Sequence, residues 1–173
     1  MPDLDGEIVV PKLGFFSEKV SFPAVYEGET PWVSVCPSEI CSMGRDIDAA
    51  RGSVLVLGLG LGYYPFRIGE KKEVREIVIV ERSREIIELF ETHLLPHFPC
   101  RDKIRVVQAD AFAYLEKTPP GRFTFCYADI WEGMADGMAA YRRIKPLEAR
   151  LPGTEFRYWI EKEILWSLEN QPR

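Results

Sequence analysis

The chain has 173 residues, of which 46% are hydrophobic and 28% charged, a composition typical of one globular domain with a sizeable core. Its apolar runs are too short to cross a bilayer and its opening, MPDLDGEIVV, is acidic, so we expect a soluble, cytoplasmic protein without membrane contacts. The net charge of −5 offers no basic surplus for nucleic acid, and the four cysteines have neither zinc nor redox spacing, so no metal site is expected.

The first 50 residues are acidic, with nine acids against three bases. Residues 7–36 hold short apolar runs between prolines, which predict short strands or extended segments with a turn at EGET. Residues 38–50 predict a helix that Ser38 caps.

A regular alternation of strand-like and helix-like segments begins at residue 54. Short apolar runs predict strands covered on both faces, at residues 54–58, 77–81, 104–110 and 123–129. Helices are predicted between and after them, over residues 64–71, 84–95, 111–117, 134–149 and 155–169. This rhythm predicts an α/β fold, a Rossmann-like parallel sheet with right-handed crossovers and helices on both faces. We divide the chain into an N-terminal β or extended segment, residues 1–36, and a Rossmann-like domain, residues 37–173.

The last two predicted helices carry side chains with more than one interpretation. Trp159 and Trp166 share an apolar helix face, for which a core contact or a homodimer contact is the ordinary explanation. The basic cluster Arg142, Arg143 and Lys145 is expected to be a solvated helix face.

Three glycines at alternate positions, Gly58, Gly60 and Gly62, follow the first strand of the alternation. A phosphate loop would need a lysine and a hydroxyl residue next, but Tyr63, Tyr64 and Pro65 follow. A dinucleotide fingerprint would need a glycine where Tyr63 or Pro65 stands. The alternating glycines instead suit S-adenosylmethionine, whose bulky arm and ribose need bare backbone beside them.

Acids stand at the carboxyl ends of the next three strands, at Glu81, Asp110 and Asp129. Ligands of open parallel sheets bind along that edge, which the glycines share. A carboxylate at Glu81 can accept two hydrogen bonds from a ribose diol, and Asp110 can accept from an adenine amino group that Phe112 covers. The plainer interpretations are a tight turn at the glycines, helix caps at Glu81 and Asp110, and a loop residue at Asp129.

The runs VLVLGLGLG, IVIVERS, VVQADAF and FTFCYADIW resemble, in this order and spacing, the class I S-adenosylmethionine-dependent methyltransferases, most closely the spermidine-synthase-like branch, over residues 50–131. The resemblance implies S-adenosylmethionine as the cofactor and Asp129 at the reactive end as the candidate catalytic residue. Trp131, two residues further on, is expected either to line the substrate pocket or to fill the core. The resemblance also implies cofactor binding by Gly58, Leu59, Gly60, Gly62, Tyr63, Glu81, Arg82, Asp110, Ala111 and Asp129.

The sequence also departs from the family pattern. Val56 stands where many members have an acid, and ADIWEG lacks the asparagine–proline motif, although Asp129 and Glu132 have the spacing of two acids in spermidine synthases. Members usually continue with a fifth strand and a hairpin, whereas the residues after Asp129 are predicted to be mostly helical. We therefore expect a sheet truncated after its fourth strand, with the N-terminal strands beside it or completing it.

The resulting functional hypothesis is a methyltransferase that acts on a small-molecule or protein acceptor. The alternatives are a non-catalytic module that binds an adenosyl ligand, and an aminopropyltransferase-like enzyme that uses decarboxylated S-adenosylmethionine.

Overall fold

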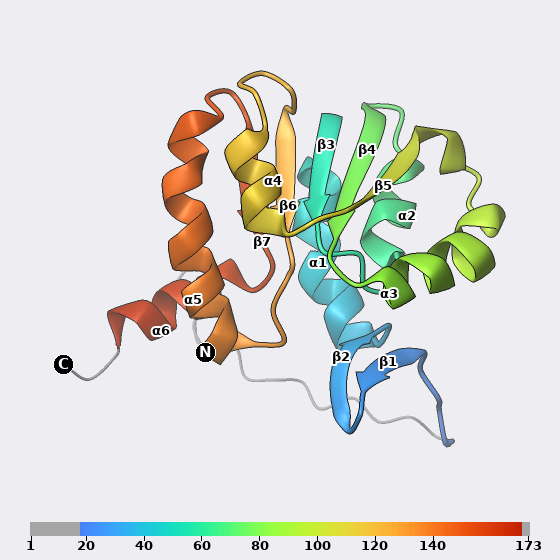
Figure 1. Cartoon of the computed structure of the whole chain (residues 1–173). Helices are drawn as coiled ribbons and strands as arrows, with labels where there is room; N and C mark the ends of the chain where they lie inside the picture. The colour runs from blue at the N-terminus through green and yellow to red at the C-terminus, as the bar shows by residue number, and fades with distance from the viewer. Residues whose placement is uncertain (1–17, 171–173) are drawn as a thin grey trace.

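The computed structural model describes residues 18–170, which form a five-stranded parallel sheet with helices on both faces and a separate β-hairpin (Figure 1). The hairpin consists of β1 (Ala24–Glu27) and β2 (Thr30–Ser34), paired antiparallel. Helix α1 (Pro37–Ala49) connects it to the sheet, and its N-cap is Cys36 rather than the predicted Ser38. The predicted strands before residue 18 lie outside the described residues.

The five strands run in the order β5-β4-β3-β6-β7, with all neighbours parallel. They are β3 (Gly52–Leu57), β4 (Val74–Glu81), β5 (Ile104–Gln108), β6 (Phe125–Ala128) and β7 (Glu155–Tyr158). The helices are α2 (Tyr63–Gly69), α3 (Arg84–Leu89), α4 (Ala111–Lys117), α5 (Met134–Ile144) and α6 (Glu161–Glu169). A π-helical turn (Phe90–Leu94) and three 3₁₀ turns, Leu95–His97, Arg101–Lys103 and Lys145–Arg150, complete the connections.

The apolar runs form strands because both faces of the sheet are covered. Leu55, Leu57 and Val80 pack beneath α4 and α5, whereas Val54 and Val56 pack against α1 and α2. Alternate residues of one strand therefore supply two separate cores.

The predicted α/β Rossmann-like class is confirmed, but the predicted truncation of the sheet is wrong. Residues 155–158 are not the start of the last helix; they form β7 beside β6, so the sheet is not truncated after its fourth strand. Of the two expected placements of the N-terminal strands, beside the sheet or completing it, the second does not occur, because β1 and β2 pair only with each other among the described strands. Within residues 18–170, no helix is long and apolar enough to span a membrane.

Candidate functional site

A cavity of about 850 Å³ opens along the carboxyl ends of the parallel strands. In Figure 1 this edge faces downwards, towards the hairpin, which lies below it. Residues of the hairpin, α1, the loops after β3, β4, β5 and β6, and α5 line the cavity. Its volume is in the range of small-molecule and cofactor sites.

The glycine corner, residues 58–62, forms the turn between β3 and α2. Gly58 and Gly62 have φ angles of 93° and 77°, which side chains rarely adopt. A β-carbon at Gly58 would overlap the carbonyl oxygen of Asp129, and one at Gly62 would overlap the ring of Phe90. The chain itself therefore approaches these glycines closely, so the plainer interpretation of a tight turn applies at Gly58 and Gly62.

Only part of the corner faces the cavity. Gly58, Leu59 and Gly60 line it, but Gly62 does not; Gly62 is the N-cap of α2. A β-carbon at Gly60 would lie 3.2 Å from Val33 of β2, so the hairpin packs against the corner.

Glu81, at the end of β4, holds the corner through its carboxylate. Its Oε2 accepts a hydrogen bond from the amide of Leu59 at 3.1 Å, and its Oε1 accepts from the amide of Ser83 at 2.8 Å. Each carboxylate oxygen can accept a further hydrogen bond. Glu81 is thus fixed beside the cavity with acceptor capacity left over, while the guanidinium of the neighbouring Arg82 lies 5.6 Å from the ring centre of Trp32.

Asp110, Ala111 and Phe112 line the cavity at the start of α4. The Oδ1 of Asp110 accepts a hydrogen bond from the amide of Ala113 at 2.9 Å, so the plainer interpretation of Asp110 as a helix cap is correct for this oxygen. The guanidinium of Arg143 lies 3.6 Å from the ring centre of Phe112 and also lines the cavity. Arg143 is exposed, as expected for the basic cluster, and in addition reaches the cavity.

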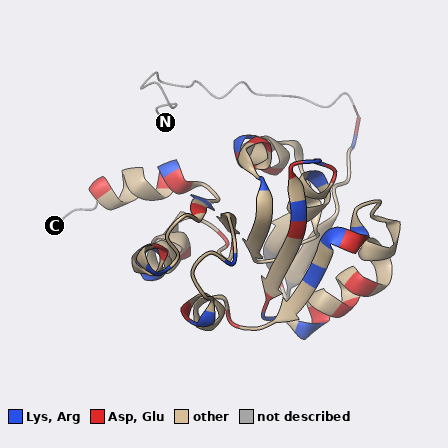
Figure 2. Ribbon diagram, turned by 90° about the horizontal axis from the view of Figure 1, so that it is seen from above, with Lys and Arg blue, Asp and Glu red and all other residues tan. Residues whose placement is uncertain are grey.

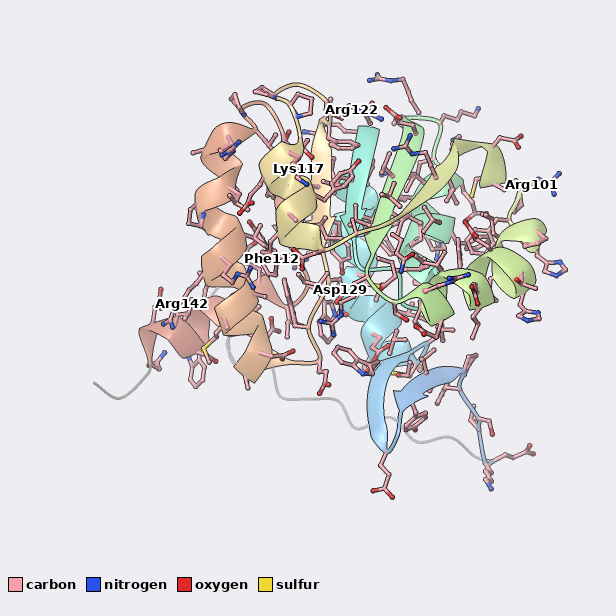
Figure 3. All side chains as sticks on the ribbon, in the orientation of Figure 1. Arg101, Phe112, Lys117, Arg122, Asp129 and Arg142 are labelled. Carbon is pink, nitrogen blue, oxygen red and sulfur yellow. The ribbon has the colours of Figure 1, made fainter. Side chains whose placement is uncertain are left out.

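Asp129 follows β6, and Figure 3 shows it at the same end of the strands as Phe112. Its side chain makes no hydrogen bond or ion pair with another described residue. Burial, followed by the negative charge of Glu39, raises the pKa of Asp129 from its ordinary value to about 7. This carboxyl group is therefore partly protonated near neutral pH.

Two buried donors lie beside Asp129 on the cavity wall. Within residues 18–170, the Tyr127 hydroxyl and the Trp131 indole N–H have no hydrogen-bond partner, although both side chains are at most 3% exposed. The ring of Tyr127 stacks on Tyr64 at 3.9 Å between centres, and Trp131 packs in the core below α5. Unpartnered buried donors are costly, and here a ligand's acceptor atoms could satisfy them.

The second acid near Asp129 comes from α1, not from the loop after β6. Glu132 is exposed and does not line the cavity, so the acid spacing seen in spermidine synthases brings no carboxylate pair together here. Glu39 faces the cavity instead, and its carboxylate accepts hydrogen bonds from the amide and hydroxyl of Ser34. Tyr63 also lines the cavity, and its hydroxyl accepts a hydrogen bond from Arg67.

No protein-family model and no curated protein matches this sequence. Solved structures do. Precorrin-8W decarboxylase from Methanobacterium thermoautotrophicum is similar at 16% identity and a TM-score of 0.55, over 84% of this chain and 75% of that one. The 23S rRNA methyltransferase ErmE is similar at 20% identity and a TM-score of 0.51, over 75% and 50%.

A spermidine synthase, in complex with the transition-state analogue AdoDATO, has 15% identity and a TM-score of 0.50, over 70% of this chain and 42% of its own. At identities this low, the similarity establishes a shared fold alone. The chain has the Rossmann-like α/β fold of class I S-adenosylmethionine-dependent methyltransferases, which spermidine synthase shares, and it spans half or less of the ErmE and spermidine synthase chains.

Proposed function

We propose that this protein binds S-adenosylmethionine and transfers its methyl group to a small-molecule or protein acceptor. The observation that carries the proposal is the cavity itself, which brings the glycine corner, Glu81, Asp110 and Asp129 to one edge of a methyltransferase-type sheet. Similarity in fold to the methyltransferase ErmE supports the same reaction class.

The residues of the cavity fit the parts of this cofactor. Glu81 would accept hydrogen bonds from the ribose hydroxyls, because its position is fixed by two backbone amides and acceptor capacity remains. Asp110 would accept from the adenine amino group through Oδ2, since Oδ1 already caps α4, and Phe112 would cover the ring. Asp129 and Glu39 would lie near the positively charged end, because these two carboxylates form no ion pair with a described residue and their proximity is otherwise unfavourable.

When bound, the cofactor supplies a methyl group already activated by a positive sulfur, so the protein's contribution is mainly positioning. The hairpin and α5 would hold the acceptor against the cavity and exclude water. Asp129 would accept the proton that a hydroxyl or amine acceptor loses, because its pKa of about 7 leaves part of the population able to take one.

Calorimetric titration tests the ligand assignment directly. We expect S-adenosylmethionine and S-adenosylhomocysteine to bind and NADH to give no heat. Tighter binding of decarboxylated S-adenosylmethionine would support aminopropyl transfer instead. Binding of NADH without binding of either sulfur compound would overturn the assignment.

A substitution at Glu81 tests where the ligand lies. Glu81→Gln should weaken S-adenosylmethionine binding by about 1.5–3 kcal/mol, because a charged acceptor of the ribose is lost. The matched control is Glu88→Gln, on the exposed side of α3, where the carboxylate pairs with Arg84 and does not line the cavity. Equal affinities for the two variants would remove Glu81 from the site.

Release of S-adenosylhomocysteine in the presence of candidate acceptors separates an enzyme from a binding module. Turnover that disappears in Asp129→Asn, while calorimetric binding remains, would support catalysis. Binding without turnover for any tested amine, hydroxyl or protein acceptor would favour the non-catalytic alternative.

A further inference from the structure

The β7 edge of the sheet carries backbone groups that no described residue pairs with. Glu155 N donates to the carbonyl of Thr124 and Trp159 N to that of Ala128, both at 3.0 Å, so these residues face β6. Hydrogen bonding alternates along a parallel strand. The amide and carbonyl groups of Phe156 and Tyr158 therefore point away from the sheet.

The charged side chains on this edge are complementary to those of an antiparallel copy of the same strand. Glu155 and Arg157 lie two residues apart on one face of β7, where Arg157 already donates to the Glu155 carboxylate at 2.7 Å and 2.9 Å. If a second β7 lies antiparallel to the first with Phe156 opposite Phe156, each Glu155 stands opposite an Arg157 of the other copy. Opposite charges directly across two strands are favourable.

The same register also suits the backbone. The backbone amide and carbonyl of Phe156 point away from the sheet, so two copies of this residue can exchange both hydrogen bonds at the two-fold axis. Glu155 and Arg157 of opposite copies then form the closer, non-hydrogen-bonded pairs. The other edge strand does not offer this match. β5 contains Arg105 but no acid, so two copies of it would gain no opposite charges.

Apolar side chains extend the surface beyond the strand. Helix α6 lies past the β7 end of the sheet in both views (Figures 1 and 2), and Leu165 and Trp166 on it are 39% and 48% exposed. A four-residue strand buries too little area for a stable complex, whereas an added aromatic anchor is typical of interfaces.

We propose that a second copy of this chain docks on the β7 edge, antiparallel about a two-fold axis at Phe156, and joins the two five-stranded sheets into one. The partner is another copy because β7 itself offers Glu155 and Arg157 in the order that an antiparallel β7 complements. The proposal does not depend on the ligand of the cavity.

Reversing the charge of Glu155 or Arg157 tests the pairing. The molar mass is measured by light scattering at about 100 µM, a concentration at which a dimer of micromolar affinity is formed. The wild type should be a dimer, and Glu155→Lys and Arg157→Glu should each be monomeric, because like charges then meet twice across the axis. An equimolar mixture of these two variants should form a dimer again, since every cross-axis pair is then opposite in sign.

The mixture separates the interface from the pair within one copy, which stays broken in both variants. A monomeric wild type would overturn the proposal, and so would single variants that remain dimeric. A mixture that stays monomeric, although each variant keeps the wild-type circular dichroism spectrum, would overturn it too.

Hydrogen exchange of the wild type provides a second measurement if a variant fails to fold. The Phe156 and Tyr158 amides should be protected at high concentration and should exchange faster on dilution. Protection that does not change on dilution, in a monomer, would show that another part of the same chain covers the edge, and would overturn the proposal.

Discussion

Asp129 is an acid placed where its charge depends on what occupies the cavity. Burial and the neighbouring Glu39 disfavour its charged form and raise its pKa to about 7. A positively charged ligand would favour the charged form and lower that pKa. Binding of such a ligand should therefore release a proton from Asp129 when the pH is near or below 7.

The substitution Asp129→Asn makes this measurable. In the wild type, affinity for S-adenosylmethionine should rise as the pH increases from 5 to 8 through the Asp129 pKa, by about tenfold if the charge contributes about 1.4 kcal/mol. In the variant that rise should be absent, while titration of the ligand's own groups remains the same. Calorimetry in buffers of different ionisation enthalpy counts the protons, and identical proton release by both proteins would contradict the role of Asp129.

For single residues, the sequence predicted the acids at the strand ends but not the charged residues that lie beside them in the cavity. Glu81, Asp110 and Asp129 could be found because each follows a recognisable apolar run. Glu39 and Arg143 could not, because they reach the cavity only through packing of α1 and α5 against distant parts of the chain. Such contacts leave no periodic signal in a single sequence.

Among the elements, α2 shows how much a glycine contributes when the chain packs against it. Gly62→Ala should destabilise the fold by about 1–3 kcal/mol more than Gly121→Ala, because the new methyl group must displace the fully buried Phe90. Gly121 is a matched control, with a φ of 76° against 77° and nothing within 4 Å of the added carbon. Urea unfolding measures both, and equal losses would mean that backbone strain alone accounts for Gly62.

The element that sequence reasoning missed is β7. Its four residues, Glu-Phe-Arg-Tyr, alternate polar and apolar as a strand does. A helical pattern follows almost directly, and four residues are too few to be distinguished from the start of that helix. Each of the first four sheet strands contains a run of apolar residues and was found for that reason. The order of the strands in the sheet depends on tertiary pairing rather than on local sequence. The same is true of the position of β7 at the edge of the sheet.

For the whole molecule, two buried acids with raised pKa values shape how stability responds to pH near neutrality. The pKa of Asp46 is raised to about 6, chiefly by burial, and that of Asp129 to about 7, so the folded state binds more protons than the unfolded chain between about pH 4 and pH 7. Both acids therefore lower the free energy of unfolding as the pH rises through this window. Glu76 acts in the opposite sense, because hydrogen bonds from Arg122 lower its pKa and are lost in acid.

We therefore expect the melting temperature to be highest on the acidic side of neutrality and to fall towards pH 8. In the double variant Asp46→Asn with Asp129→Asn, the fall between pH 5 and pH 8 should be smaller. Melting curves recorded by circular dichroism across this range measure the difference. A melting temperature that rises from pH 5 to pH 8 in the wild type would contradict the assigned shifts.

The cavity takes one wall from the hairpin, near residue 33, and another from α5, near residue 143. Its lining residues extend from Val25 to Trp159, so no short stretch of the polypeptide encloses it. During synthesis on the ribosome, the enclosure arises only after α5 has emerged and met a hairpin made long before. Retention of a small molecule there would thus report that translation had passed that helix.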